Sequence, residues 1–514
     1  MVATTTKALT FEEAPQFFKE LKALGKTIVQ CHGTFDLVHP GHVCHLEEAA
    51  GLGDVLVVTV TAEAFVNKGP GRPYFDDELR VKSLAALECV DHVVVVPYKA
   101  AVEAIECVNP DVYCKGIEYA KPENDATGNI QDDIKTVKAL GGQVSYLGSR
   151  VFSSTRLLNK RFEVYTPAVK AFCEHLSKTV SADQFRDAVD SFQGLKVLVV
   201  GDIIFDRYTT VCVQGLTSKN RILSGRFIKE QTQAGGSLAV FRHLKAFTDS
   251  VRLISLVGNE PWVARDLDAY LSPEENGVIY DSSFTSVVKQ RFVEPQAEGK
   301  ELSKLFSTNY LNDGPPEMDL QERVLDRIRQ EIKGYDLVVV TDFGHGVLST
   351  CIRELIQAEA PCLALNCQTN SNNHGFNIIN RQYQRADIFS LDAAEIKLAC
   401  GLRNPDFIEE LRHLKGQLGA QAAWLTRGAI ETIGLSGKED LCVCPPLEQK
   451  IVDAVGAGDA FFAVAALGAV RKLPLALATF MGQLAGAQAV KIVGNKDSIS
   501  KADLIKSGTT MLSF

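Results

Sequence analysis

The feature that most constrains the fold of this chain is a repeated alternation of short apolar runs with longer amphipathic segments. Continuous apolar runs, such as TIVQCHG (27–33) and DVLVVTVTA (54–62), predict strands that are buried on both faces. Each run is followed by a segment of helical character, such as residues 39–53. Because parallel strands need long crossover connections, usually helices, this alternation predicts an α/β fold with parallel sheets.

The alternation occurs twice, and 514 residues are enough for two or three domains. A polar amphipathic segment at about 163–193 separates the two series, and an apolar run at 195–202 opens the second. We therefore expect a first domain over residues 1–160 and a helical linker, or the start of the next domain, over 161–193. The second domain is expected over 194–514.

Composition narrows the class of protein. The formal net charge of −9 argues against a general nucleic-acid binder, a class that usually carries a basic patch or stripe. The thirteen cysteines follow neither a disulfide nor a metal-ligand rhythm, so we expect reduced, mostly buried thiols. No apolar run has spanning length, and residues 1–18 lack a signal-peptide core. These patterns predict a cytoplasmic protein that binds neither membranes nor nucleic acid.

The stretch CHGTFDLVHPGH (31–42) directly follows the first predicted strand, where α/β sheets bind ligands. Pro40 suits the first turn of a helix, and His39 and His42 then face the same way. Helix N-termini attract phosphate, and Gly33 and Gly41 allow close approach of the backbone. Capping or packing histidines, or half of a metal site, are the alternatives, although further metal ligands are not evident.

These residues resemble the GxFDxxHxGH signature of the nucleotidyltransferase superfamily, and the resemblance extends over about residues 25–160. Further segments resemble other motifs of that family in the same order: GRPYFDDELR (Arg72, Pro73, Arg80), YCKGIEY (Lys115, Gly116, Glu118, Tyr119) and FSSTRLLN (Ser153, Ser154, Thr155). The resemblance implies a Rossmann-like domain that couples a sugar phosphate or alcohol phosphate to a nucleotide and releases pyrophosphate.

The same resemblance implies roles for individual residues. His39 and His42 would contact the triphosphate, and Lys115 the attacking phosphate or the α-phosphate. Lys68, in the sequence VNKGPGRP, is either a further phosphate contact or a solvated loop lysine. The other implied nucleotide-binding or phosphate-binding residues are Gly33, Thr34, Phe35, Asp36, Gly41, Arg72, Ser153, Ser154 and Thr155.

A second constellation, DAVGAGDAFFA (453–463), is a glycine-rich turn that opens an apolar helix. Its spacing fits neither a P-loop nor a dinucleotide fingerprint. Gly456, Ala457 and Gly458 can present consecutive N–H groups to an anion, and Asp459 lies beside them. A carboxylate there suits a base that activates a hydroxyl for attack on a phosphoryl group. The alternative is a tight turn with Asp459 as a helix cap.

This turn resembles the D-T-x-G-A-G-D signature of the ribokinase/PfkB carbohydrate kinases, and the resemblance covers about residues 195–510. It implies a ribokinase-like α/β domain in which Asp459 is the catalytic base. The implied sugar-binding residues are Asp202, Asp206, Gly235 and Gly236; the nucleotide-side residues are Thr426, Gly428, Gly456, Ala457 and Gly458; and Glu395 would reach Mg²⁺ through water.

Three departures from the kinase pattern concern the acceptor side. Ala239 stands where the family usually has Asn, His345 replaces the Lys of heptose kinases, and Asp392 precedes Glu395 in place of Asn. A polar segment rich in asparagine, QTNSNNHGFN (368–377), is either a surface loop or a substrate or subunit contact.

Together the two halves resemble the bifunctional enzymes of nucleotide-activated heptose synthesis, with the transferase placed first. The expected reactions are phosphorylation of a heptose 7-phosphate at its anomeric hydroxyl, then nucleotidyl transfer to the sugar 1-phosphate. The cofactors would be Mg²⁺ and ATP, with ATP or CTP as nucleotidyl donor, and the protein a homodimer or higher homo-oligomer. The alternatives are another sugar or polyol phosphate, or a kinase half that is regulatory or dimerising.

Overall fold

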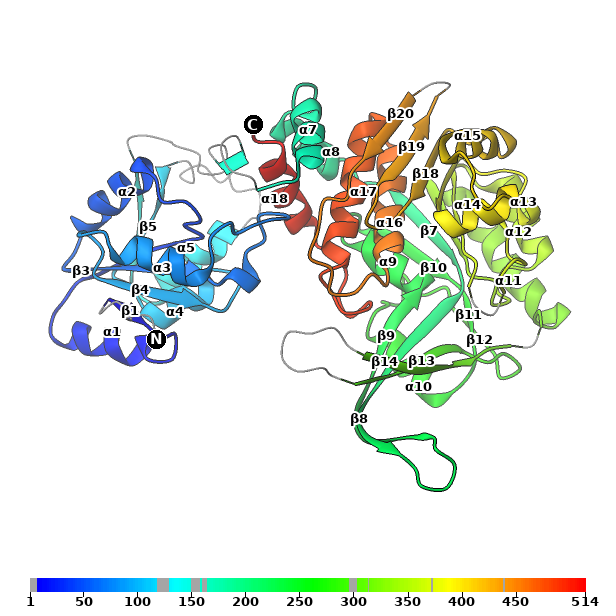
Figure 1. The fold of residues 1–514 in the computed structure, drawn as a ribbon, viewed down its shortest axis with the longest axis horizontal. Helices are drawn as coiled ribbons and strands as arrows, with labels where there is room; N and C mark the ends of the chain where they lie inside the picture. Colours follow the sequence, from blue (N-terminus) through cyan, green and yellow to red (C-terminus); the bar gives the residue numbers. More distant parts are fainter. Residues whose placement is uncertain are drawn as a thin grey trace. The chain divides into compact units, whose positions relative to one another are not determined.

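The computed structural model describes residues 7–117, 129–148, 158–159, 164–294, 303–312, 314–370, 373–437 and 440–514 (Figure 1). The chain divides into two compact units, one of residues 1–186 with 505–514 and the other of residues 187–504. The division falls within the helical linker expected over residues 161–193, and the first unit extends past residue 160. The last ten residues also join the first unit, which the sequence patterns do not predict.

The first unit is built on a six-stranded sheet in which every neighbouring pair of strands is parallel, in the order β1-β4-β3-β2-β5-β6. Its strands are β1 (Ala8–Leu9), β2 (Ile28–Gly33), β3 (Val55–Thr61), β4 (His92–Val96), β5 (Val112–Gly116) and β6 (Gln143–Leu147). Its helices are α1 (Ala14–Ala23), α2 (Pro40–Ala50), α3 (Asp77–Ala85), α4 (Val102–Val108), α5 (Asn129–Ala139) and α7 (Pro167–Leu176), with a 3-10 turn at Glu63–Phe65. The predicted parallel sheet is confirmed.

The sequence of each element explains its place in this unit. All seven residues of β3 are buried, because both faces of a parallel sheet are covered. Helix α2 begins with Pro40 at its first position, where a missing N–H costs nothing, and it ends at Ala50 before Gly51. Val29, Val58 and Leu46 pack into one apolar cluster between the sheet and α2.

The second unit contains an eight-stranded sheet in the order β10-β7-β15-β16-β17-β18-β19-β20, parallel as far as β18 and antiparallel beyond it. Its strands are β7 (Lys196–Gly201), β10 (Ser250–Ile254), β15 (Leu337–Asp342), β16 (Leu363–Cys367), β17 (Ile388–Asp392), β18 (Ala422–Thr426), β19 (Thr432–Ser436) and β20 (Asp440–Cys444). A separate pair is formed by β11 (Leu256–Val257) and β12 (Ile279–Tyr280).

Helices cover both faces of the eight-stranded sheet (Figure 1). One layer contains α9 (Ser237–Lys245), α16 (Ala457–Val470) and α17 (Leu475–Ala489). The opposite layer contains α11 (Met318–Glu331), α12 (Thr350–Glu359), α14 (Ala393–Cys400) and α15 (Phe407–Gln417), whose apolar residues share one core cluster with the strands. The shorter α10 (Pro261–Asp268), α13 (Ile379–Gln382) and the 3-10 turn Ile332–Gly334 complete the unit.

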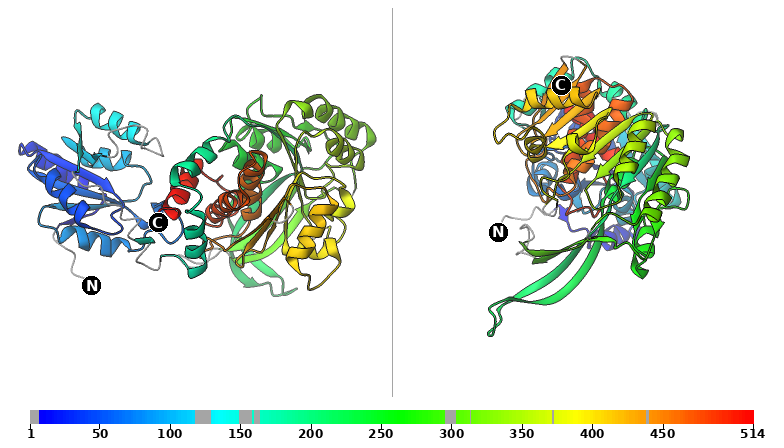
Figure 2. Two further views of the ribbon diagram at one scale, coloured as in Figure 1. Left: turned by 90° about the horizontal axis from the view of Figure 1, so that it is seen from above. Right: turned by 90° about the vertical axis from the view of Figure 1, so that its right-hand side faces the viewer.

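A four-stranded sheet in the second unit is not predicted by the sequence analysis. It has the order β14-β13-β8-β9, from β8 (Ile203–Leu216), β9 (Leu223–Gly236), β13 (Val287–Glu294) and β14 (Ser303–Tyr310). Strands β8 and β9 form a long antiparallel hairpin that extends away from the rest of the unit (Figure 2). We call this sheet the side sheet.

The amphipathic segment expected at 163–193 is two helices, α7 and α8 (Ala182–Asp190). Both α8 and the final helix, α18 (Lys501–Met511), contain residues of each unit. Ser181 and Gln184 cap α8 reciprocally, because each side chain bonds to the backbone N–H of the other.

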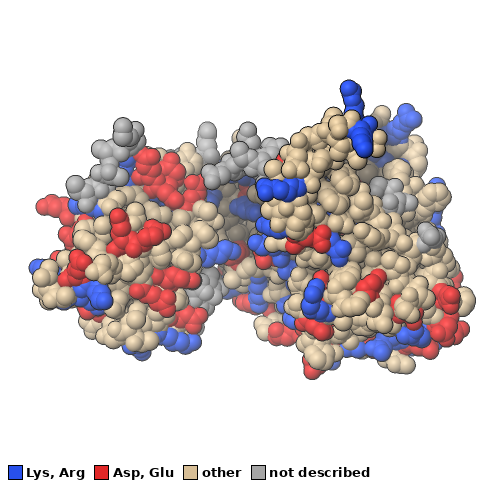
Figure 3. Space-filling view, turned by 90° about the horizontal axis from the view of Figure 1, so that it is seen from below, with Lys and Arg blue, Asp and Glu red and all other residues tan. Residues whose placement is uncertain are grey.

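Other general expectations can be compared with the structure. All thirteen cysteines are free, as predicted. Within the described residues no helix combines the length and the apolar character that a membrane crossing requires. On the face shown in Figure 3, acidic side chains lie among basic ones in both units, in keeping with the net charge of −9.

Candidate active sites

The predicted histidine pair lies at the carboxyl end of β2, where the chain turns into α2. His39 is the N-cap of α2, and its Nδ1 accepts the backbone N–H of His42 at 3.3 Å. The two rings stack with centroids 3.9 Å apart, so both histidines do lie on one side of the first turn. Burial, together with the charges of His39, Lys68 and His45, lowers the pKa of His42 to about 3. His42 is therefore neutral at pH 7.

Basic groups gather around this turn. The pKa of Lys68 is lowered to about 8, first by burial and then by the charges of Lys506 and Arg72. The pKa of His32 is lowered to about 3 by burial, Lys115 and Lys506. Such mutual repulsion is relieved by a bound anion. Lys68 thus has the surroundings of a phosphate contact and not those of a solvated loop lysine.

Lys115 is placed at the end of β5 and is already paired. Its Nζ lies 3.2 Å from Oδ2 of Asp133 and above the ring of Tyr113. The carboxylate keeps the ammonium at the edge of the sheet that carries the histidines, because β5 is the neighbour of β2. A phosphate at this position would compete with Asp133 for Lys115.

Asp36 and Arg72 bond to protein groups, which favours a structural role over the predicted phosphate contact. Arg72 Nη1 donates to Asp36 Oδ2 at 3.0 Å in a buried ion pair. Asp36 Oδ1 also accepts the N–H groups of Tyr74 and Phe75, at 2.7 and 3.1 Å. Arg72 Nη2 donates to Asn159 Oδ1 at 2.9 Å. This network fixes the turn that presents the histidines.

The other predicted residues of this turn are positioned through the backbone. Arg80, fully buried, donates to the carbonyl oxygens of Thr34 and Thr61 at 2.7 and 2.9 Å. Gly33 ends β2, Phe35 has a left-handed φ of 45°, and Gly41 lies in the first turn of α2. Ser153, Ser154, Thr155, Glu118 and Tyr119 lie outside the described residues, so their predicted roles stay predictions.

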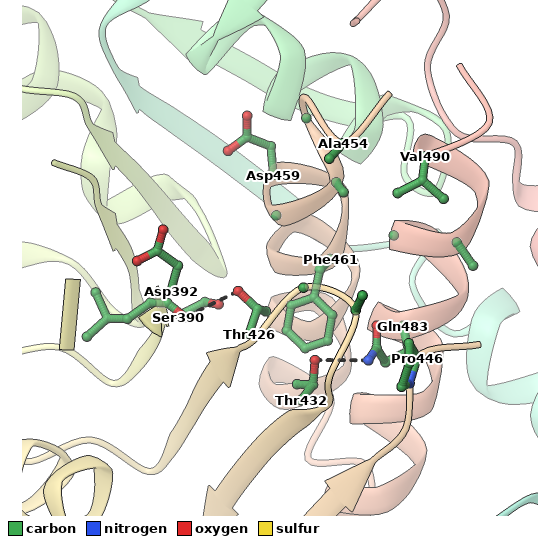
Figure 4. A pocket seen from close by; sticks show the side chains of 18 of the residues that line it. Ser390, Asp392, Thr426, Thr432, Pro446, Ala454, Asp459, Phe461, Gln483 and Val490 are labelled. Atoms are coloured by element: carbon green, nitrogen blue, oxygen red, sulfur yellow. Dashed lines mark hydrogen bonds between the residues drawn. The ribbon is translucent and has the colours of Figure 1, made fainter. Parts of the chain in front are cut away.

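The second site is a pocket of about 620 Å³ at the N-terminus of α16 (Figure 4). Gly456 is the N-cap and has a φ of +81°, and a Cβ there would clash with the side chain of Asn495. Ala457, Gly458 and Asp459 form the first turn, whose N–H groups have no partner within the helix. The pocket therefore includes the helix start predicted to bind an anion.

Asp459 is buried beside this position. Gln368 Nε2 donates to its Oδ1 at 2.9 Å and to Asn366 Oδ1 at 2.7 Å. Burial raises the pKa of Asp459 to about 7, against the lowering effect of the Gln368 hydrogen bond. A carboxyl that titrates near neutral pH can take a proton from a hydroxyl and later release it.

The side sheet brings the predicted Asp206 and Gly235 beside Asp459, together with Arg291 and Lys289, which the motifs do not indicate. Asp206 on β8 pairs with Arg291 on β13, and it accepts from Asn495 Nδ2 at 3.4 Å. Gly235 has no room for a Cβ because Asp206 and the β8 backbone lie against it. Burial lowers the pKa of Lys289, whose charge in turn acts on Asp459. Carboxylate, guanidinium and ammonium groups together suit a polar, anionic acceptor.

Asp202 is placed differently from the prediction of a sugar contact. Its carboxylate is buried and accepts the N–H groups of Phe343, His345 and Val347 at 3.0 to 3.2 Å. Burial and the neighbouring Asp342 raise its pKa to about 6. The geometry favours an anchor for the loop after β15 over a sugar ligand. Gly236 begins α9 above it, with a φ of +59°.

In its described part the asparagine-rich segment bonds to neighbouring backbone groups, and its first two residues, Gln368 and Thr369, line the pocket, so the substrate contact stays a prediction. Asn370 and Asn373 donate to the carbonyl of Phe343 at 2.9 and 2.7 Å. Asn377 donates to the carbonyl oxygens of Asp342 and Gln368 at 3.0 Å each. The segment therefore braces the loop after β15 and the backbone of Gln368, which bonds to Asp459.

Of the acceptor-side departures, Ala239 is buried in α9, and His345 lies beside Lys289 and Asp342. Burial, reinforced by Lys289, lowers the pKa of His345 to about 4. His345 is therefore neutral at pH 7, whereas a lysine at the same position would carry a positive charge.

The nucleotide side of the pocket contains Thr426, Gly428 and the start of α14. Asp392 and Glu395 form a capping box, in which Glu395 Oε2 accepts the N–H of Asp392 at 2.8 Å. Glu395 Oε1 accepts the N–H of Thr369 at 3.3 Å. Burial and Asp392 raise the pKa of Glu395 to about 8. Glu395 also lines the pocket, so its contact with Mg²⁺ through water stays a prediction.

Sequence reasoning missed several residues that the fold brings to the two sites. Gln368 and Asp459 are 91 positions apart, and Arg291 and Asp206 are 85 apart. A single sequence gives no sign of such distant pairs. Asn159, 87 positions from its partner Arg72, belongs to the same class.

Comparison with protein-family models finds one match in each unit. Residues 31–174 match the family described as cytidylyltransferase-like, and residues 321–502 match the pfkB family of carbohydrate kinases. The chain joins a cytidylyltransferase-like domain to a pfkB carbohydrate kinase domain. The histidine turn lies in the first matched segment, and Asp459 lies in the second.

Curated relatives include proteins named "Bifunctional protein HldE". The one from Aliarcobacter butzleri is 40% identical over 137 residues, which are 26% of this chain and 28% of that protein. The one from Azorhizobium caulinodans is 43% identical over 114 residues, or 22% and 24% of the two chains. The chain thus matches less than a third of the length of these relatives.

Solved structures similar to this chain include phosphofructokinase-2 from Escherichia coli in complex with substrates and products. The phosphofructokinase-2 chain is 14% identical to the present chain, with a TM-score of 0.48. The match covers 61% of the present chain and 98% of phosphofructokinase-2. Arabidopsis thaliana ribokinase complexed with ribose and ATP is 15% identical with a TM-score of 0.46, covering 62% and 99%.

Proposed function

We propose that this protein is a bifunctional enzyme of nucleotide-activated sugar synthesis, which phosphorylates a sugar phosphate of the heptose 7-phosphate type and then couples it to a nucleotide. The observation that carries this proposal is the presence of two anion-binding helix starts in one chain. One has paired neutral histidines, and the other has a buried carboxyl with a pKa of about 7. We also propose that the protein is cytoplasmic, in keeping with its thirteen free cysteines.

In the kinase step, the anomeric hydroxyl of the sugar phosphate attacks the γ-phosphorus of ATP. Asp459 accepts the hydroxyl proton, the new O–P bond forms, and the bond to the β-phosphate oxygen breaks to release ADP. N–H groups of Gly458 and Asp459 at the start of α16 stabilise the negative charge that the phosphoryl group carries. Asp206 and Lys289 hold the acceptor.

In the transferase step, a phosphate oxygen of the sugar 1-phosphate attacks the α-phosphorus of ATP or CTP, and pyrophosphate leaves. No proton needs to be removed from a phosphate dianion, so neutral histidines serve as hydrogen-bond donors and not as bases. His39 and His42 face the triphosphate. Lys115 exchanges Asp133 for the attacking phosphate or the α-phosphate, which neutralises charge as the bond forms.

Both families of reaction use a nucleotide that carries Mg²⁺. In the described part of the chain no group of three His, Cys, Asp or Glu side chains could hold a metal ion. Glu395 bonds to two backbone N–H groups and lines the pocket. The nucleotide would bring Mg²⁺ to the pocket, and Glu395 would hold the ion through a water molecule.

The rival function keeps the transferase but makes the kinase half regulatory or dimerising, or changes the acceptor to another sugar or polyol phosphate. Ala239 and the neutral His345 favour a changed acceptor, because a positive charge expected near the sugar is missing. Asp459 and its hydrogen bond from Gln368 favour an active kinase.

The test is a product assay with ATP or CTP, Mg²⁺ and a panel of sugar phosphates that includes heptose 7-phosphate, read by mass spectrometry. Asp459→Asn is expected to stop phosphorylation while leaving transfer to a supplied sugar 1-phosphate. His39→Ala is expected to do the reverse. A wild-type enzyme that uses sugar 1-phosphates but phosphorylates no acceptor would establish the rival function.

We also propose that the protein is a homodimer that pairs through the side sheet. Large apolar side chains on its hairpin and edge strand are exposed: Leu216, Ile222, Phe227, Ile228, Phe306 and Tyr310 are 48% to 63% accessible. Exposed apolar groups in this number on one sheet indicate an interface. Sedimentation should give a dimer for the wild type and a monomer for Phe227→Asp; a monomeric wild type would reject the proposal.

A further inference from the structure

The residues that follow the kinase half return to the first unit and join its buried hydrogen-bond network. Asn159 Nδ2 donates to the carbonyl oxygens of Thr510 and Ser513, at 2.8 and 3.0 Å. Asn159 Oδ1 accepts from Arg72, which pairs with Asp36 in the histidine turn. The end of α18 is thus connected to that turn through buried side chains.

A second contact places α18 against the loop that carries Lys68. Gly69 has a φ of +96°, and a Cβ built there would lie 3.3 Å from Cβ of Ser507. Lys506 precedes Ser507 on the helix and is partly buried. This turn of α18 therefore lies against the loop, and the charge of Lys506, the residue before Ser507, acts on Lys68.

The charges around Lys506 indicate what it faces. Lys506 contributes to the lowered pKa values of both Lys68 and His32, and Lys68 contributes to that of His42. Lys506, Lys68 and the histidine turn therefore lie close to one another within the first unit. Like charges held this close disfavour one another unless an anion of several charges joins them, which a triphosphate does.

We propose that Lys506, carried on α18, contacts the triphosphate of the nucleotide during nucleotidyl transfer, together with Lys68 and the histidine turn. The proposal rests on the transferase function proposed above. The active site of the first unit is then completed by a residue that lies more than three hundred positions beyond Arg186, where the first segment of that unit ends.

The test supplies a sugar 1-phosphate directly, so that the kinase is not needed, and measures pyrophosphate release with the full-length protein. For Lys506→Ala we expect the KM for the nucleoside triphosphate to rise about tenfold, because one charge-assisted hydrogen bond to the triphosphate is lost. The KM for the sugar 1-phosphate stays unchanged. Lys506→Arg, which keeps the charge, restores most of the affinity, and inhibition by pyrophosphate weakens in Lys506→Ala by the same factor.

The matched control is Lys501→Ala. Lys501 lies on the same helix but pairs with Asp190 at 2.7 Å, so its removal should leave the KM for the triphosphate unchanged. An unchanged triphosphate KM in Lys506→Ala, or a rise confined to the sugar 1-phosphate, would overturn the proposal. A wild-type protein with no transfer to any sugar 1-phosphate would instead reject the transferase function itself.

Discussion

At the scale of single residues, burial decides which groups can carry chemistry. Asp459 and Glu395 are both buried carboxyls with raised pKa values, but their hydrogen bonds differ. Glu395 accepts two backbone N–H groups and closes a helix cap, whereas Asp459 accepts from one side chain, Gln368. Asp459, which accepts fewer of these hydrogen bonds and lies at the anion-binding turn, is therefore the carboxyl that can exchange a proton with a substrate.

The first prediction concerns the pH dependence of the kinase. Because the base must be deprotonated and its pKa is raised to about 7, kcat/KM should fall as pH drops through 7. Gln368→Leu removes a hydrogen bond that lowers this pKa, so the acid limb should move to higher pH. Initial rates across neutral pH check both points. An acid limb at the pH where an ordinary carboxyl group titrates would contradict the assignment of Asp459 as the base. An acid limb that does not move in Gln368→Leu would also contradict it.

At the scale of elements, the apolar runs predict the parallel strands well, because both faces of such strands are buried and the signal is continuous. The side sheet escapes prediction because its strands are not continuous apolar runs, and in β9 only the last four residues are buried. The break between α7 and α8 has a readable signal, the Ser181–Gln184 capping box. The helix start at Gly456 is the element for which motif and structure agree most fully.

A prediction at this scale tests that helix start. Gly456→Ala places a side chain in the left-handed region and against Asn495, which should lower the free energy of unfolding by about 1–2 kcal/mol. Gly458→Ala is the matched control, because nothing lies within 4 Å of its Cβ position and alanine favours helices. Thermal unfolding should separate the two variants. Equal melting temperatures would show that the turn is not strained by a side chain.

At the scale of the whole molecule, the chain contains two units with one site each. Motifs predict both sites and the order of the units, because each signature is a short local sequence. They do not predict that residues 505–514 belong with the first unit, since that depends on contacts between distant segments. Asn159 and Lys506 are invisible to motif reasoning for the same reason.

Since each unit holds its own site, the two reactions should be separable in solution. A mixture of His39→Ala and Asp459→Asn proteins is expected to form the nucleotide sugar that neither forms alone, because the sugar 1-phosphate diffuses from one protein to the other. Mass spectrometry of the products checks this outcome. If each variant keeps its remaining activity and the mixture still forms nothing, the intermediate must stay on a single molecule.

The return of residues 505–514 to the first unit has a consequence for biosynthesis. During translation, residues 1–186 leave the ribosome first, but their unit lacks its last helical segment until residues 187–504 have also been made. At roughly 5–20 residues per second, that interval lasts on the order of half a minute. During this interval Asn159 has no Thr510 or Ser513 carbonyl to bind. The first unit of the nascent chain therefore stays incomplete until the second unit has been synthesised.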